Sequence, residues 1–353
     1  MTGEHVETSV KQSRIAVIGT GGTFAMHGRH RFDWIEYADS GVIHPLDDLL
    51  KSMGELSPEL EIVPIPFRSL GSVAIGTNDW LELARLIRDT AAADPSLCGF
   101  VITHGTATME ETAWFLDQIL CLDMPVVLTG AQRPGNTDGS DAPANLRSAM
   151  AVANDRASRG LGVLVVMGGL IFAARDVTKA ASFELAAFEA PPYGPLGRVD
   201  ADASVVYRRL PVAERSKKKR FDRLLDGDVA LPRVDISVSY AGADGAAIRA
   251  FAAAGARGIV CAGLTPGRIA AGEREAILEA VDAGVTVVQS TRSPRGVVPV
   301  QRFLTADGLL AGGDLSPQKL RITLILLLAL QEYGRTPKDL PDAQSLQRQI
   351  LDA

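Results

Sequence analysis

The chain contains the stretch Val101-Ile102-Thr103-His104-Gly105-Thr106-Ala107-Thr108-Met109-Glu110-Glu111-Thr112. A short apolar run ends there in His-Gly-Thr-x-Thr, and a helical pattern begins at Met109. A strand followed by a glycine-containing turn and a helix start places side chains at the carboxyl end of a parallel sheet, where ligands bind. The two threonines therefore indicate a nucleophilic or oxyanion-binding turn. The alternative is that Thr106 and Thr108 only cap the helix, because Thr-x-Thr-x-Glu-Glu is similar to a capping box.

The same alternation of strand and helix runs through most of the 353 residues. Short apolar runs predict strands over 14–18, 60–67, 99–103, 125–129, 162–167, 234–239, 257–262 and 285–289. Helical periodicity predicts helices over 46–53, 78–93, 109–121, 142–158, 244–254, 271–282 and 317–333. Strands that alternate with helices predict an α/β fold whose parallel sheets are covered on both faces.

The length predicts two domains. We expect a flexible tail over 1–13, a larger N-terminal doubly wound parallel-sheet domain over 14–207, a linker over 208–232 and a smaller C-terminal α/β domain over 233–353. The linker is predicted because this region is rich in charge and poor in apolar periodicity. The apolar run 322–330 is too short to cross a bilayer and is expected to be a buried helix.

Composition restricts the class of protein. Hydrophobic residues make up 46% of the chain and charged residues 22%, which is typical of a globular protein. The formal net charge of -6 argues against a nucleic-acid partner, and the basic run 217–220 is interpreted as a solvated linker face. The polar first residues do not resemble a signal peptide. Cys98, Cys121 and Cys261 have no metal or redox spacing, so we expect small core residues in a reducing cytoplasm.

A glycine-rich turn, Gly19-Thr-Gly-Gly-Thr23, follows the first predicted strand. It is not a G-x-G-x-x-G motif, and no P-loop lysine follows, so a nucleotide site is not expected. Thr20 and Thr23 lie just beyond the strand, where glycines would let a ligand approach the backbone closely. The alternative is that Thr23 caps a helix.

The segment Arg175-Asp-Val-Thr-Lys179 is a second candidate for catalysis. A lone lysine is usually solvated, but Lys179 could act as a base if burial lowers its pKa. Folding can bring Lys179 to Thr106 only if adjacent parallel strands carry both. In that case we expect a hydrogen bond of about 2.6–3.2 Å between them.

These motifs resemble those of the bacterial-type asparaginase family. Thr20-Gly-Gly-Thr-Phe-Ala25 resembles its first signature, and Ile102-Thr-His-Gly-Thr-Ala-Thr-Met-Glu-Glu-Thr112 resembles its second. The resemblance continues through the segments 125–134, 140–145, 175–179, 193–197 and 315–319. It therefore covers nearly the whole chain in order.

The resemblance implies hydrolysis of a side-chain amide to acid and ammonia, without a metal or cofactor. Thr23 matches the family's nucleophile, while Thr106 and Lys179 match a hydroxyl–amine pair that assists proton transfer. Tyr37 is our candidate for the tyrosine of a mobile N-terminal loop, although an ungapped match places Asp39 there. Family sites form between paired subunits, so a homodimer or homotetramer is expected.

The departures from the family pattern concern substrate binding. Ala107 stands where the second signature normally has an aspartate that holds the substrate's α-ammonium. In the segment 70–75, Ser72 matches a serine that contacts the substrate carboxylate, while Val73 and Ala74 replace a glutamine and an aspartate. In the second domain, Pro266 replaces an asparagine near the ammonium. The substrate-binding candidates are therefore Ser72, Val73, Gly105 and Ala107.

These losses favour an amidohydrolase for a carboxamide that lacks a free α-amino group. A substrate ammonium buried without a counter-charge would cost several kcal/mol. A genuine L-asparaginase and a non-catalytic binding or regulatory protein on the same fold remain alternatives. A transfer-RNA amidotransferase subunit would need a partner subunit and a nucleic-acid surface, which the acidic charge does not favour.

Overall fold

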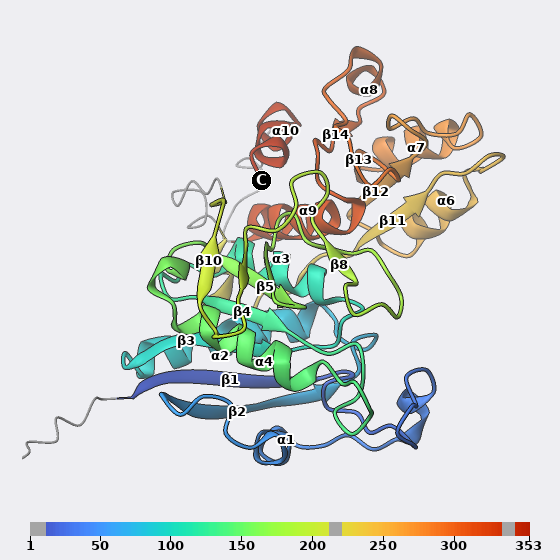
Figure 1. The fold of residues 1–353 in the computed structure, drawn as a ribbon. Helices are drawn as coiled ribbons and strands as arrows, with labels where there is room; N and C mark the ends of the chain where they lie inside the picture. The colour runs from blue at the N-terminus through green and yellow to red at the C-terminus, as the bar shows by residue number, and fades with distance from the viewer. Residues whose placement is uncertain (1–11, 212–220, 334–342) are drawn as a thin grey trace, which may run out of the picture.

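A computed structural model describes residues 12–211, 221–333 and 343–353, and it contains two α/β domains that pack against each other (Figure 1). The larger N-terminal domain is built on an eight-stranded sheet, and the smaller C-terminal domain on a four-stranded sheet. The predicted fold class is thereby confirmed. Most of the expected tail and all of the basic run 217–220 lie outside the described residues.

The large sheet has the strand order β10-β9-β6-β5-β4-β3-β1-β2. Its strands are β1 (Ser13–Gly21), β2 (Leu60–Leu70), β3 (Leu97–Thr103), β4 (Val126–Thr129), β5 (Val163–Met167), β6 (Leu170–Ala173), β9 (Gly197–Val199) and β10 (Val205–Tyr207). The five strands β2, β1, β3, β4 and β5 pair in parallel, as expected.

The other three strands of this sheet are antiparallel, which the sequence analysis missed. The chain reverses between β5 and β6 at Gly168 and Gly169, whose φ angles are 58° and 74°. Two adjacent residues with positive φ match a two-residue hairpin turn, and glycine adopts such angles without strain. The pair Gly-Gly between two apolar runs was the available signal for this hairpin.

Helices cover both faces of the large sheet. On one face lie α1 (Leu46–Met53) and α4 (Ala142–Asn154), and on the other α2 (Thr77–Ala93) and α3 (Met109–Ile119). Alternate residues of β1 point to opposite sides, since Ile15 and Val17 join the core with α1 and α4, and Ile18 joins the core with α2 and α3. This is the doubly wound arrangement predicted from the alternation.

The C-terminal sheet is parallel, in the order β11 (Val234–Val238), β12 (Gly258–Gly263), β13 (Thr286–Thr291) and β14 (Leu310–Ala311). Its helices are α6 (Ala246–Ala253), α7 (Arg274–Asp282), α8 (Arg302–Ala306), α9 (Pro317–Glu332) and α10 (Ala343–Leu351). The short elements β14 and α8 and the helix α10 were not predicted, because each carries too few periodic apolar residues to stand out.

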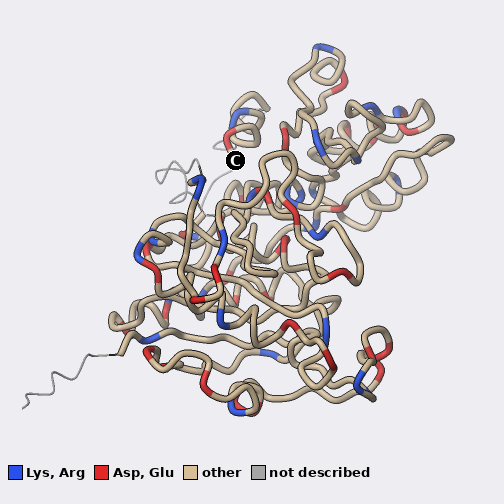
Figure 2. Tube along the Cα trace, viewed as in Figure 1, with Lys and Arg blue, Asp and Glu red and all other residues tan. Residues whose placement is uncertain are grey.

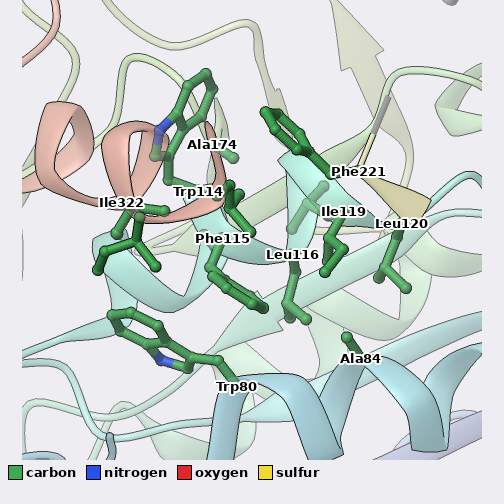
Figure 3. Packing of buried hydrophobic residues seen from close by; sticks show 14 of the residues in the cluster. Trp80, Ala84, Trp114, Phe115, Leu116, Ile119, Leu120, Ala174, Phe221 and Ile322 are labelled. Atoms are coloured by element: carbon green, nitrogen blue, oxygen red, sulfur yellow. The ribbon is translucent and has the colours of Figure 1, made fainter. Parts of the chain in front are cut away.

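Helix α9 joins the cores of the two domains. Its apolar run is buried, as expected, and belongs to one hydrophobic cluster with α2, α3 and the inner strands of both sheets. Figure 3 shows part of this cluster, with Trp80 of α2, Trp114 and Phe115 of α3, and Ile322 of α9. Phe221, Leu224 and Leu225 are also buried in it. The end of the region expected as a linker therefore packs into the core.

Three surface properties bear on the expected location and partners. Within the described ranges, no helix is long and apolar enough to cross a membrane. Figure 2 shows the positions of Lys and Arg interspersed with those of Asp and Glu along the backbone of both domains. Cys98 is half-buried and Cys261 buried, but Cys121 is exposed, so the expectation that all three are core residues is wrong for Cys121.

Candidate active site

Three turns interlock at the carboxyl edge of the large sheet. The strands β1 and β3 end side by side, with Gly19 paired to Thr103, and the turn after β2 adjoins both. A Cβ atom added at Gly22 would overlap the backbone of Gly105, and one added at Gly105 would overlap Ser72. The absence of a side chain at Gly22 therefore lets the backbone of the neighbouring turn approach closely.

Thr23 lies in the first of these turns, and its side chain faces Tyr37. Thr23 is 7% exposed, and its Oγ1 lies 2.8 Å from the hydroxyl of Tyr37, so that either group can donate a hydrogen bond. A tight turn, and not a helix, follows Thr23, so the helix-cap alternative is wrong. Asp39, the ungapped alternative to Tyr37, is exposed. The geometry thus favours Tyr37 over Asp39 as the partner of Thr23.

The loop that carries Tyr37 is held by the segment after β4. The side-chain amide of Asn136 accepts a hydrogen bond from the N–H of Gly28 (2.8 Å) and donates one to its carbonyl (2.7 Å). The guanidinium of Arg133 stacks on the Trp34 ring, 3.9 Å from its centroid. These contacts fix both the start and the middle of the loop, and so place Tyr37 beside Thr23.

Thr106 and Lys179 form the second pair. The Nζ of Lys179 donates a hydrogen bond of 2.7 Å to Oγ1 of Thr106, which is 5% exposed. The expected hydrogen bond is therefore present. Burial lowers the pKa of Lys179, which favours its neutral form. Thr108 donates its hydroxyl hydrogen to the carbonyl of Ser72 (2.8 Å), and no side chain caps α3, so the capping interpretation is wrong.

Lys179 reaches Thr106 by a route that differs from the expected one. It lies on β7 (Thr178–Lys179), which pairs antiparallel with β8 (Phe188–Glu189) in a separate two-stranded sheet. The two residues are therefore not on adjacent parallel strands. The short connection 174–177 leads from β6 directly into β7, and it places Lys179 beside Thr106 at the carboxyl edge of the large sheet, an arrangement that no short-range pattern in the sequence encodes.

Two further residues support this pair. The imidazole of His104 is fully buried, donates from Nδ1 to the carbonyl of Gly105 (2.7 Å) and accepts at Nε2 from Thr112 (2.9 Å). Burial lowers the pKa of His104 to about 4, so the ring is neutral near pH 7 and orders the turn without adding charge. Glu110 accepts a hydrogen bond of 2.7 Å from the backbone N–H of Lys179. The sequence analysis assigned Glu110 to a capping box and missed this contact.

The rim of the site is apolar where the family pattern is polar. Val73 is 88% exposed, Ala74 and Ala107 are also exposed, and Ser72 is half-buried against Gly105. Pro266 lies on the C-terminal domain, in the turn that follows β12. In the parts of the chain that the structure describes, no group of three or more His, Cys, Asp or Glu side chains could hold a metal ion.

Comparisons with known proteins agree with this fold. The model of the asparaginase N-terminal domain matches residues 14–212, and that of the glutaminase/asparaginase C-terminal domain matches residues 233–340. The chain is 35% identical to a probable periplasmic L-asparaginase of Haemophilus influenzae over 92% of its length and 91% of the relative's. It is 36% identical to L-asparaginase 2 of Escherichia coli, over 89% of this chain and 88% of that one.

A solved structure is similar over nearly its whole length. The probable cytoplasmic L-asparaginase of Campylobacter jejuni superposes with a TM-score of 0.86 at 33% identity, covering 96% of this chain and 99% of the other. Fold, paired hydroxyls and these similarities together define a hydrolase that acts on amides. The chain belongs to the asparaginase family, whose two domain models match it in order.

Proposed function

We propose that the protein hydrolyses a carboxamide to a carboxylate and ammonia, with Thr23 as the nucleophile. The observation that carries this proposal is that two hydrogen-bonded pairs lie close together. Thr23 and Thr106 lie on turns whose backbones touch, and the hydroxyl of each is paired with a second group, the Tyr37 hydroxyl for Thr23 and the Lys179 amine for Thr106. We call Thr23–Tyr37 the first hydroxyl pair and Thr106–Lys179 the second hydroxyl pair. Thr23 Oγ1 attacks the amide carbon, ammonia leaves, and water then hydrolyses the threonine ester. Backbone N–H groups of the turns stabilise the oxyanion of each tetrahedral intermediate.

Both hydroxyls have a partner that can move their protons. A threonine hydroxyl is a weak nucleophile until a base removes its proton. Tyr37 is in direct contact with the Thr23 hydroxyl and relays its proton, which leaves with ammonia. In the second step, in which water hydrolyses the threonine ester, neutral Lys179 accepts a proton from that water through the Thr106 hydroxyl. The lowered pKa of Lys179 supports this role, because only the unprotonated amine is a base.

The apolar rim supports a substrate without a free α-amino group. Ala107 and Val73 offer no counter-charge to an ammonium. The nearby carboxylate of Glu110 already accepts the N–H of Lys179. An ammonium desolvated beside these residues would lose its hydration without gaining a partner. We therefore favour an amide whose α-position is unsubstituted or carries a blocked amine.

A genuine L-asparaginase is the second candidate. It is supported by relatives of this chain that are named L-asparaginase, and by others named glutaminase-asparaginase. In that case the α-ammonium is held by a group outside the residues discussed above, such as one from a second subunit.

An ammonia-release screen separates these candidates. The purified protein is assayed with L-asparagine, L-glutamine, D-asparagine, N-acyl asparagine and succinic acid monoamide. The favoured function requires a higher kcat/KM for the last two substrates than for L-asparagine. The reverse order would establish the second candidate, and release from none of them would contradict both.

Tyr37→Phe tests the first hydroxyl pair. This change removes the Tyr37 hydroxyl, which lies 2.8 Å from the Thr23 hydroxyl, while keeping the ring. We expect kcat for the best amide of the screen to fall by about 10²-fold, which is the lower end of the range for loss of a general acid–base group. KM should change little. Wild-type kcat in Tyr37→Phe would exclude Tyr37 from proton transfer.

Ala107→Asp tests the assignment of specificity. The new carboxylate supplies the counter-charge that the family aspartate provides, so the ratio of kcat/KM for L-asparagine to that for succinic acid monoamide should rise. Breaking such a pair costs about 3–5 kcal/mol, but Val73 and Pro266 remain, so we expect a partial gain of roughly tenfold. Ala107→Asn is the matched uncharged control. An unchanged ratio would place the ammonium elsewhere.

We further infer that the protein acts as a homodimer or homotetramer in the cytoplasm. Large apolar side chains stay exposed on the single chain, with Val73 at 88%, Phe183 at 63%, Tyr193 at 60% and Tyr240 at 58%. Exposed apolar side chains of this size become buried where they lie in a subunit interface, which supports an oligomer. The cytoplasmic location is supported by the name of the relative from Campylobacter jejuni. Sedimentation of the purified protein measures the oligomeric state directly.

A further inference from the structure

The ammonium of Lys319 is buried beneath the segment that carries Lys179. Lys319 lies in the first turn of α9, is 3% exposed, and belongs to the C-terminal domain. Its Nζ donates hydrogen bonds to the carbonyls of Arg175 (2.7 Å) and Val177 (2.5 Å). These two carbonyls precede β7 by only a few residues, so Lys319 fixes the backbone that leads into Lys179.

The backbone of the same residue contacts the helix that follows Thr106. The indole Nε1 of Trp114 donates to the carbonyl of Lys319 and to Oγ1 of Thr323, both at 3.1 Å. Trp114 lies on α3, which begins directly after the Thr106 turn, and Figure 3 shows its ring against α9. Lys319 thus contacts both the segment that leads into Lys179 and the helix α3 that follows Thr106.

The charge of Lys319 is supported by its surroundings. Burial lowers its pKa to about 8, while the carboxylates of Glu110 and Asp176 oppose that shift, so the group is mostly protonated at pH 7. Glu110 is also the acceptor of the Lys179 N–H. The two lysines are therefore linked on two sides, through the carbonyls of 175 and 177 and through Glu110.

We propose that Lys319 is a positioning residue that holds Lys179 against Thr106 from the C-terminal domain. The proposal rests on the proposed function, since it assigns the purpose of this contact to the second hydroxyl pair. Without the ammonium, the buried carbonyl of Val177 and the partly buried carbonyl of Arg175 lose this donor, and the segment 175–179 moves to find other partners. Such a movement separates Lys179 from Thr106 without unfolding either domain.

Lys319→Met is the test, because methionine keeps the length of the side chain and removes its donors. Arg321→Met is the matched control, since Arg321 lies on the same helix and donates to the carbonyl of Val234 (2.7 Å), within the C-terminal domain. We expect kcat of Lys319→Met to fall by about tenfold or more, with KM nearly unchanged. Arg321→Met should keep the wild-type kcat.

A second measurement does not depend on amide hydrolysis. The rate of acetylation of Lys179 by trace acetic anhydride, followed by mass spectrometry against pH, reports the pKa of its amine. In Lys319→Met this pKa should rise toward the ordinary value, because a displaced Lys179 becomes solvated. In Arg321→Met it should match the wild type. This profile can be recorded even if the proposed reaction is wrong. Failure of the positioning role of Lys319 can therefore be distinguished from failure of the proposed function.

A folded Lys319→Met protein with wild-type kcat and a wild-type acetylation profile would overturn the proposal. Equal losses in Lys319→Met and Arg321→Met would also overturn it, since they would indicate a general effect on α9. If Lys319→Met does not fold, Lys319→Gln replaces it. The amide of glutamine retains donors but is too short to serve both carbonyls, so the same change in the Lys179 profile is required, and its absence counts against the proposal.

Discussion

Thr23→Ala should reduce ammonia release by roughly 10³-fold or more while leaving the fold intact. The substitution removes the hydroxyl that we assign as the nucleophile. The side chain is small and lies at the carboxyl edge of the sheet, outside the hydrophobic clusters, so little packing is lost. The measurement is single-turnover and steady-state ammonia release, with the circular dichroism spectrum as a check on folding.

Thr23→Ser is the matched control, because it retains the hydroxyl and loses only a methyl group. We expect partial activity in Thr23→Ser and trapping of an acylated peptide containing residue 23 in acid-quenched wild-type enzyme. If Thr23→Ala turned over the best substrate within a few-fold of the wild-type rate, Thr23 would not be the nucleophile. Acylation of Thr106 instead would exchange the roles of the two pairs.

The second large effect is expected for Lys179→Met, which should lower kcat by about 10²–10⁴-fold. The amine is the hydrogen-bond partner of Thr106, and burial lowers its pKa below the ordinary 10.5. Since the neutral amine acts as the base, wild-type activity should rise as the pH increases through this lowered pKa. In Lys179→Met that limb of the pH profile should disappear.

Lys179→Arg separates hydrogen bonding from proton transfer. A guanidinium can still donate to Thr106, but it stays protonated and so cannot accept a proton. Loss of activity in both Lys179→Met and Lys179→Arg would support a base. Recovery in Lys179→Arg would contradict it and would indicate that only a positive charge or a donor is needed at this position.

Much of the fold could be predicted because each βα unit carries its own local signals. The strand 99–103, the glycine turn and the helix from Met109 were all visible as changes in apolar periodicity, and the structure has them within a few residues. The antiparallel strands β6, β9 and β10 could not be found in this way. They have three or four residues each, too few for a periodic pattern to stand out, and the pairing of β6 with β9 joins segments distant in the chain.

The residues of the candidate site could be predicted from the sequence, but most of the contacts that hold them in place could not. Thr23, Thr106 and Lys179 came from the motifs, and the pairing of Thr106 with Lys179 is present. The route to that pairing was wrong, because β7 and β8 form a sheet of their own. Glu110 and Lys319 were missed as supports, since a sequence does not reveal which distant carbonyl or N–H group a charged side chain will meet.

The helices α2, α3 and α9 share one hydrophobic cluster. The two domains therefore have separate sheets but do not have separate hydrophobic cores. A helix encoded near the C-terminus completes the interior of the N-terminal domain. Recombination between relatives at the region 208–232 would therefore separate two halves of one interior. Exchanged halves would remain compatible only where the contacting surfaces of α3 and α9 had changed together. The two domains are therefore expected to have evolved together.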